Sequence, residues 1–217
     1  MKFLKLCLIG FCLVATQLVA NGLQEGKDYI LLDKPIANMD NTVLEIYNIG
    51  CPHCAYYNEN FLPNLLEFLP ENVEFLPYHI AAPIEIHQEM SKILVVALSK
   101  DKQNKTSTKS PNALYKKVLN YYFDAIHKEK RNWKNPQDFA SKGLEIIGID
   151  EVEYQKILET KEAKEMLQKW QSLIEYANIQ GVPSFIVNGK YMVSSQNLKG
   201  TEDFIYKIDY LLKKSNF

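Results

Sequence analysis

The 217-residue sequence has little cysteine, no surplus of either charge and no long apolar segment. Its four cysteines are Cys7, Cys12, Cys51 and Cys54, and the first two lie in an apolar N-terminal stretch. Once that stretch is removed, a single pair remains, which cannot build the spread framework of bridges that stabilises many secreted domains. Zinc is disfavoured, because Cys-x-x-Cys supplies only half of a tetrahedral ligand set and no second pair follows. A purely structural disulfide across so short a loop would gain little stability.

The charge balance argues against nucleic acid as a partner. The whole chain has 25 basic and 26 acidic residues, and removal of residues 1–20 leaves 23 basic and 26 acidic residues, a net charge of −3. A basic patch of the kind that follows a phosphate backbone is not indicated. An apolar content of 47% is sufficient for one large domain, or one domain with an insertion. We expect no metal and no bound cofactor.

Residues 1–20 have the pattern of a secretory signal peptide. Lys2 and Lys5 precede an apolar run over residues 6–14 that only Gly10 interrupts, and small residues follow, so that cleavage is expected after residue 20, or alternatively after residue 22. The run is shorter than the roughly 18 apolar residues that a membrane-spanning helix needs. We therefore expect an exported, soluble mature protein, with a retained N-terminal anchor as the alternative.

Hydrophobic periodicity divides the remaining chain into three parts. Residues 43–47 and 73–79 read as strands, and residues 52–68 between them as a helix that Pro63 should kink. Pro77 indicates that the second strand either ends there or lies near a sheet edge. From residue 82 to residue 179 the spacing is helical throughout, apart from a polar, lysine-rich loop at residues 100–109.

The C-terminal part returns to strand character. Residues 185–187 and 191–193 flank Asn188-Gly189, a strong hairpin signal because both turn residues must accept positive φ. A helix with an apolar face follows at residues 204–212. We predict an α/β domain (residues 21–81 and 171–217) that an all-helical insertion (residues 82–170) interrupts.

Cys51-Pro52-His53-Cys54 is the candidate redox site. After the turn at residues 47–50, Cys51 should cap a helix with Pro52 at its first position, where the missing N–H costs nothing. Cys54 then lies on the same face, within bridging range, and Cys51 points outward as the attacking sulfur. The helix N-terminus and a protonated His53 stabilise a Cys51 thiolate, and a stabilised thiolate favours the reduced form. The pair is therefore expected to give its disulfide away, as an oxidant does.

A second motif, Gly181-Val182-Pro183, stands directly before the hairpin. Together with Cys51-Pro-His-Cys54 it resembles the two motifs of the thioredoxin superfamily, and specifically those of the bacterial DsbA-type thiol oxidases. The resemblance spans the mature chain and includes three further stretches: residues 26–29, residues 32–35 and Tyr78-His79. It implies a thioredoxin fold that a helical insertion interrupts.

The resemblance also implies a role for several residues. Val182-Pro183 would be a cis bond lying against the cysteines and would help to bind substrate. Glu45 matches a buried acidic residue that would act with Pro52 and His53 on the redox couple, although a surface-facing strand glutamate is the alternative. The family often has a lysine where this chain has Pro77 and an acid where it has Asn58. A proton relay through that acid–lysine pair is therefore not carried over.

The function that this resemblance implies is oxidation of newly exported proteins with free thiols in the periplasm. The protein, expected to be a monomer, would be reoxidised by a quinone-linked membrane partner of the DsbB type. A disulfide isomerase or reductant and a redox-inactive, chaperone-like binding module are the alternatives. A dimeric isomerase would need an N-terminal dimerisation domain, and only residues 21–42 precede the first strand after cleavage. His79, His87 and His127 show no partner pattern and are interpreted as packing or surface residues.

Overall fold

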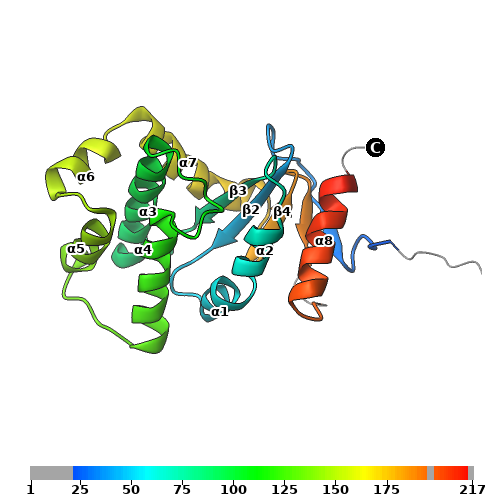
Figure 1. Cartoon of the computed structure of the whole chain (residues 1–217), viewed down its shortest axis with the longest axis horizontal. Helices are drawn as coiled ribbons and strands as arrows, with labels where there is room; N and C mark the ends of the chain where they lie inside the picture. Colours follow the sequence, from blue (N-terminus) through cyan, green and yellow to red (C-terminus); the bar gives the residue numbers. More distant parts are fainter. Residues whose placement is uncertain (1–21, 195–197, 215–217) are drawn as a thin grey trace, which may run out of the picture.

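A five-stranded sheet forms the centre of the protein (Figure 1). The computed structural model describes residues 22–194 and 198–214, so the predicted signal peptide lies outside the described residues. The strands are β1 (Tyr29–Leu31), β2 (Thr42–Tyr47), β3 (Glu74–His79), β4 (Ser184–Val187) and β5 (Tyr191–Val193). Their order in the sheet is β1-β5-β4-β2-β3, with β2 and β3 parallel and the other pairs antiparallel. This confirms the predicted mixed α/β fold with a helical segment between strands.

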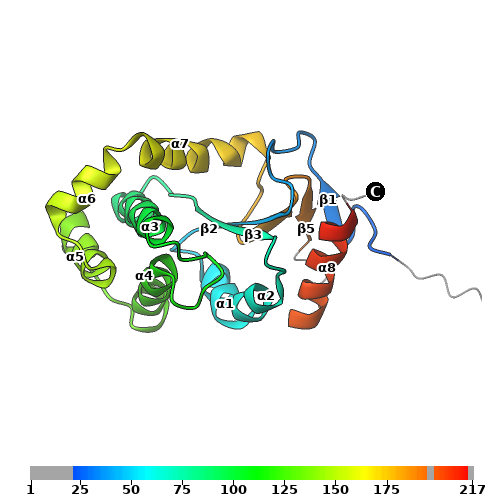
Figure 2. The ribbon, with the colours of Figure 1, turned by 45° about the horizontal axis from the view of Figure 1, so that its top comes forward.

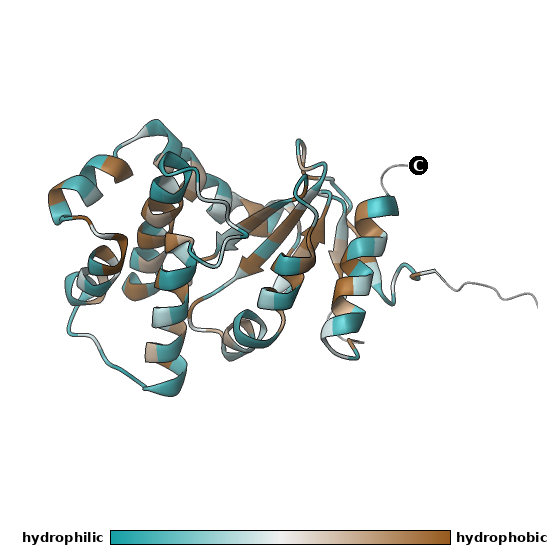
Figure 3. Cartoon of the chain, viewed as in Figure 1, coloured by the Kyte–Doolittle hydropathy of each residue, from teal (hydrophilic) through white to brown (hydrophobic). Residues whose placement is uncertain are grey.

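Helices cover both faces of the sheet. On one face lie α1 (Pro52–Asn60), α2 (Leu62–Phe68) and α8 (Thr201–Lys214), and α7 (Lys161–Tyr176) lies on the other (Figure 2). Because side chains alternate along a strand, Val43 of β2 joins the core under α2 and α8, whereas Leu44 and Ile46 join the core shared with the helical segment. Figure 3 shows the hydrophobic positions along the strands between these layers. Strand β2, which lies between β4 and β3, is buried along its whole length.

The helix predicted over residues 52–68 is two helices. The break falls at Phe61, which ends α1 and precedes α2, and Pro63 lies in the first turn of α2, where no helical hydrogen bond needs its nitrogen. The bend that Pro63 predicts is therefore present, two residues earlier than the proline itself. It directs Leu65 and Leu66 into the core beneath α8.

The helical segment comprises α3 (Glu85–Gln103), α4 (Leu114–Phe123), a π-helical turn η1 (Asp124–Lys128), α5 (Pro136–Ile147) and α6 (Glu151–Leu158). The central helix is α3, which contacts α4, α5, α6 and α7. It runs to Gln103, so the loop predicted from residue 100 begins later than expected. The expected boundary between residues 170 and 171 falls inside α7, because the apolar face of this helix continues to Leu173.

The C-terminal hairpin forms as its sequence predicts. Asn188 and Gly189 both have positive φ, 53° and 63°, and the Lys190 N–H closes the turn on the Val187 carbonyl at 3.0 Å. The sequence pattern does not predict the short strand β1. It pairs with β5 from Tyr29 opposite Val193 to Leu31 opposite Tyr191.

Strand β3 is the edge strand that Pro77 indicates. The N–H groups of Glu74 and Ile80 donate toward the β2 side, to the carbonyls of Asn41 and Tyr47. Phe75, Pro77 and His79, which alternate with these residues, therefore direct their backbone groups away from β2. On that side the Thr108 hydroxyl donates to the Phe75 carbonyl at 2.6 Å. Among the helices within residues 22–194 and 198–214, none combines the length and the apolar composition needed to cross a membrane.

Candidate functional site

The two cysteines lie at the start of α1. Cys51 is the N-cap, with extended backbone angles (φ −87°, ψ 114°), and Pro52 occupies the first turn, as the sequence predicts. The Cys54 N–H donates to Cys51 Sγ at 3.3 Å. Both side chains are thiols; Cys51 is partly exposed, whereas Cys54 is 0% exposed. Only Cys51 can therefore meet the sulfur of another protein.

The loop at Val182-Pro183 touches Cys51 across 131 residues of sequence. The Cys51 thiol donates to the Val182 carbonyl oxygen at 3.5 Å, and the bond between Val182 and Pro183 is cis. A surface hollow of about 550 Å³ adjoins this contact. It is lined by His53 and Tyr57 of α1, residues 180–184, Met192–Ser194 at the end of β5, and Gly26 and Ile30. A segment lying in this hollow would pass beside both the exposed cysteine and the loop.

Burial makes the two thiols chemically unequal. It raises the pKa of the Cys54 thiol strongly, with further contributions from the neighbouring Cys51 and Glu45, while an N–H of Asn48 acts in the opposite sense. At the Cys51 position the helix N-terminus offers its unpaired N–H groups to a negative charge. Burial therefore holds the proton on the inner sulfur, whereas the outer sulfur lies at the start of the helix.

Glu45 lies inside the protein, on β2. It is 2% exposed, and burial raises the pKa of its carboxyl from 4.5 to about 8. The sheet register puts Pro77 opposite Glu45 on one side and Phe185 on the other. The position before Tyr78-His79, where the family often has a lysine, therefore lies next to Glu45 in the sheet and is a proline in this chain.

A second hollow, of about 440 Å³, reaches Glu45 between α2 and α4. Asn58 lines it and donates to Asn120 Oδ1 at 2.7 Å. Lys116 of α4 lines it too, and burial lowers the pKa of this amine to about 8. Sequence reasoning did not single out Lys116, since nothing in its surroundings along the chain marks it as half-buried.

The remaining histidines gather around the loop Asn48–Gly50 that leads into Cys51. His79 accepts a hydrogen bond from Ile49 N–H, His127 bonds the Ile49 carbonyl oxygen, and His87 contacts the Asn48 side chain. The interpretation as packing residues holds for the buried His79, but it missed these hydrogen bonds. The partners lie 30 to 78 residues away along the chain, so no local pattern could have shown them.

Within the described ranges 22–194 and 198–214, no group of three or more His, Cys, Asp or Glu side chains is placed to hold a metal ion. His53, next to Cys54, is exposed beside the first hollow, and Pro52 is exposed at the helix start.

Comparison with known proteins gives the family. Residues 42–205 match the DSBA-like thioredoxin domain, a region that includes both cysteines and the Val182-Pro183 loop. The chain is 31% identical over 192 residues to the thiol:disulfide interchange protein DsbL of Escherichia coli O6:H1, covering 87% of this chain and 86% of that protein. It is 28% identical over 200 residues to the DsbA of Dickeya dadantii, covering 91% and 89%.

Solved structures agree with this assignment. The crystal structure of reduced DsbL superposes with a TM-score of 0.81 at 31% identity, over 88% of this chain and all of that one. The crystal structure of DsbL from Salmonella enterica serovar Typhimurium superposes with a TM-score of 0.79 at 30% identity, over 89% of this chain and 98% of that one. The similarity therefore extends over the sheet, the helical segment and the cysteine pair together.

Proposed function

The chain belongs to the DSBA-like thioredoxin domain family of thiol:disulfide interchange oxidoreductases, and from this premise we propose that it donates its Cys51–Cys54 disulfide to newly exported proteins. The observation that supports this direction is the unequal placement of the two sulfurs. Cys51 is the partly exposed N-cap of α1, and Cys54 is buried behind it with a raised pKa. A folded state that favours the reduced pair gives its disulfide away readily.

The exchange proceeds in two displacements. A substrate thiolate attacks Cys51 Sγ of the oxidised pair, the Cys51–Cys54 bond breaks, and Cys54 leaves and takes up a proton. A second substrate thiolate then attacks the substrate sulfur of the mixed disulfide, and Cys51 leaves as a thiolate. Two electrons pass from the substrate to the cysteine pair, and the substrate gains one disulfide. The helix N-terminus stabilises the departing Cys51 thiolate.

The hollow beside Val182-Pro183 supports binding of an extended substrate segment. The residues that line this hollow are largely uncharged. The Val182 carbonyl oxygen, in the loop beside it, lies 3.5 Å from Cys51 Sγ. Unfolded chains present exposed backbone and apolar side chains, which such a surface can accept with little sequence preference. Val182 and Pro183 are therefore assigned to substrate binding, and Pro52, His53 and Glu45 to tuning the couple.

The reduced pair must pass its two electrons on before another cycle. We assign this step to a quinone-linked membrane partner of the DsbB type, in the periplasm, acting on a monomer. The predicted signal peptide and the relatives among the DsbL and DsbA interchange proteins support this assignment.

The proposal is tested with the oxidised protein and a synthetic peptide that carries two cysteines. We expect the peptide to become oxidised in one turnover and the protein to become reduced, as followed by mass spectrometry after acid quenching. Cys51→Ser should abolish exchange, whereas Cys54→Ser should retain one reactive thiol and accumulate a mixed disulfide with an activated peptide. In the reduced protein, alkylation at mildly acidic pH should modify Cys51 before Cys54.

An equilibrium titration against glutathione sets the direction of electron flow. An oxidant holds its pair reduced at a glutathione ratio that leaves ordinary protein disulfides oxidised. A pair that instead holds its disulfide more firmly than glutathione would assign the protein to reduction or isomerisation. Suppression of aggregation by the Cys51→Ser/Cys54→Ser variant, without any peptide oxidation by the wild type, would indicate the chaperone-like alternative.

A further inference from the structure

The peptide groups of Ile49 are held from both sides by histidines. Ile49 N–H donates to His79 Nε2 at 3.0 Å, and the Ile49 carbonyl oxygen lies 2.8 Å from His127 Nε2. His79 comes from the end of β3 and His127 from η1, so two separate elements meet at one residue. Ile49 is itself 0% exposed, and it stands two residues before Cys51.

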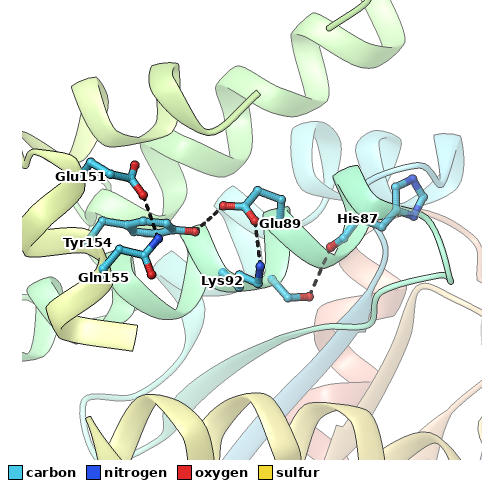
Figure 4. Close-up of polar contacts among 7 residues, drawn as sticks. His87, Glu89, Lys92, Glu151, Tyr154 and Gln155 are labelled. Atoms are coloured by element: carbon cyan, nitrogen blue, oxygen red, sulfur yellow. Dashed lines mark hydrogen bonds and ion pairs between the residues drawn. The ribbon is translucent and has the colours of Figure 1, made fainter. Parts of the chain in front are cut away.

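His87 of α3 contacts the same loop through the side chain of Asn48. The Asn48 Oδ1 accepts from the Gly50 N–H at 2.8 Å, and its Nδ2 donates to the Ile80 carbonyl at 2.6 Å and faces His87 Nδ1 at 3.2 Å. A Cβ on Gly50 would lie 2.7 Å from His87 Cε1, so the ring packs directly on the loop. Figure 4 shows the His87 ring pointing away from Glu89 and Lys92 of the same helix.

The hydrogen bonds define the proton on each ring. His79 Nε2 accepts from a peptide N–H, so its proton is on Nδ1, 2.7 Å from Ser91 Oγ. Burial, with His87 nearby, lowers the pKa of His79 to about 3, which keeps this ring neutral. His87 Nδ1 must accept from Asn48, because both Asn48 oxygen and nitrogen have fixed partners. His127 Nε2 must donate, because a carbonyl oxygen can only accept.

Two of these three side chains belong to the helical segment. His127 lies on η1, where the Glu129 N–H reaches the Asp124 carbonyl five residues back at 2.9 Å. Such a widened turn changes the direction of the side chains that follow it, and π-turns are frequent at functional sites. Here it carries His127 over the loop that precedes the redox pair.

We propose that His127, His87 and His79 are positioning residues of the redox reaction, which hold Asn48–Gly50 so that Cys51 stays at the helix N-terminus. This inference rests on the proposed function. The Cys51 N–H donates to the Asn48 carbonyl at 3.1 Å, and the backbone of Asn48 acts to lower the pKa of the Cys54 thiol against the effect of burial. Both sulfurs therefore depend on where this one loop lies.

Release of the loop would weaken the preference for the reduced state. The Cys51 sulfur accepts the Cys54 N–H at 3.3 Å only while Cys51 keeps its extended N-cap geometry. Loss of a single neutral hydrogen bond that fixes this geometry corresponds to about a fivefold change in an equilibrium constant. The same loss should slow alkylation of Cys51 at mildly acidic pH, because less thiolate is present.

The test compares His127→Leu, which removes the donor to Ile49, with His127→Gln, whose amide can donate in its place. Lys128→Ala is the matched control, because Lys128 is the next residue of η1 and its ion pairs with Glu59 and Asp124 are at the surface. For each variant the glutathione equilibrium and the alkylation rate of Cys51 are measured. We expect His127→Leu to favour the disulfide about fivefold more than the wild type. His127→Gln and Lys128→Ala should stay within about twofold.

A folded His127→Leu with the wild-type equilibrium and alkylation rate would overturn the proposal. If that variant does not fold, His87→Leu decides by the same two measurements, and wild-type values there would overturn it equally. Failure of the wild type to oxidise the dithiol peptide would refute the proposed function instead. The alkylation rates would still show whether the histidines position Cys51.

Discussion

At the scale of single residues, Glu45 is the side chain whose surroundings oppose its ordinary charge. It is 2% exposed, and burial raises the pKa of its carboxyl to about 8, so the group is protonated in the folded protein at neutral pH. Its negative form would also raise the pKa of Cys54 further. A neutral Glu45 thus leaves the redox pair without a competing negative charge, and the same carboxyl can release its proton when the pH rises.

Replacing Glu45 by glutamine should change how stability depends on pH. Between pH 4.5 and 8 the folded state binds more protons at this carboxyl than the unfolded state, so the free energy of unfolding falls as pH rises through that window. The glutamine of Glu45→Gln does not ionise, so the free energy of unfolding of this variant should not decrease in that window. Near pH 8 it should exceed that of the wild type by on the order of 4 kcal/mol more than it does near pH 4.5. Urea denaturation of the reduced proteins at several pH values measures it.

Glu67→Gln is the matched control, because Glu67 lines the same hollow from the exposed side of α2. Its unfolding curves should follow those of the wild type at every pH. Parallel pH profiles for wild type and Glu45→Gln would show that the carboxyl is ionised in the folded protein.

His53 is exposed, and we propose that it tunes the redox couple from the solvent side. A protonated imidazole between the two cysteines adds positive charge near the Cys51 thiolate, so His53→Ala should make the protein less oxidising, by about threefold in the glutathione equilibrium constant. An unchanged equilibrium across pH would mean that helix geometry alone sets the redox poise.

At the scale of elements, the loop before β4 contacts the start of α1, and both line the same hollow. The contact of Cys51 Sγ with the Val182 carbonyl shows that an atom added at Pro183 would lie at the edge of the reacting site. Pro183→Thr introduces an N–H and a hydroxyl there, which should hold the bound segment and hinder approach of the resolving thiol. We expect mixed disulfides between Cys51 and substrate to accumulate, by about tenfold or more over the wild type on non-reducing gels.

Pro136→Thr, at the start of α5 in the helical segment, serves as the control for loss of a proline. It should turn over like the wild type. If Pro183→Thr also turned over normally, the loop would have no part in substrate exchange.

Elements could be predicted from the sequence where the signal is local. The hairpin turn needs only the conformational freedom of Asn188 and Gly189, and the start of α1 needs only Cys51-Pro52. Strand β1 could not be predicted, because its three residues become a strand only by pairing with β5, near the other end of the chain. The break at Phe61 was displaced from Pro63 for a different reason, since a proline is tolerated inside the first turn of a helix.

The same distinction applies to the candidate site. Cys51 and Cys54 are three residues apart, so helix geometry alone brings their sulfurs together. Lys116 and the histidines around Ile49 reach the site from elements whose placement the fold decides, and His127 does so through a π-turn that no spacing rule describes. Sequence therefore predicts the geometry of the cysteine pair better than the residues of other elements that surround it.

At the scale of the whole molecule, the redox state should set stability. If the fold stabilises the Cys51 thiolate and the unfolded chain does not, the reduced protein must be more stable than the oxidised one, by on the order of 1–2 kcal/mol. The disulfide contributes little in return, because the loop that it closes is very short. The midpoints of urea denaturation with and without reductant measure the difference.

The Cys51→Ser/Cys54→Ser variant should give the same midpoint under both conditions, which excludes an effect of the reductant itself. A more stable oxidised form would contradict an oxidising role and would favour the reductant or isomerase alternative.

The edge strand β3 bears on the proposed function, in which the protein meets unfolded chains. Three residues of this strand turn their backbone outward: the Phe75 carbonyl already accepts from Thr108, Pro77 has no N–H, and His79 is 1% exposed. An open edge would offer passing polypeptides a template for cross-chain sheet growth, the first step of co-aggregation. Under the proposed function, an unfolded substrate therefore finds fewer free backbone groups along β3 from which to extend the sheet.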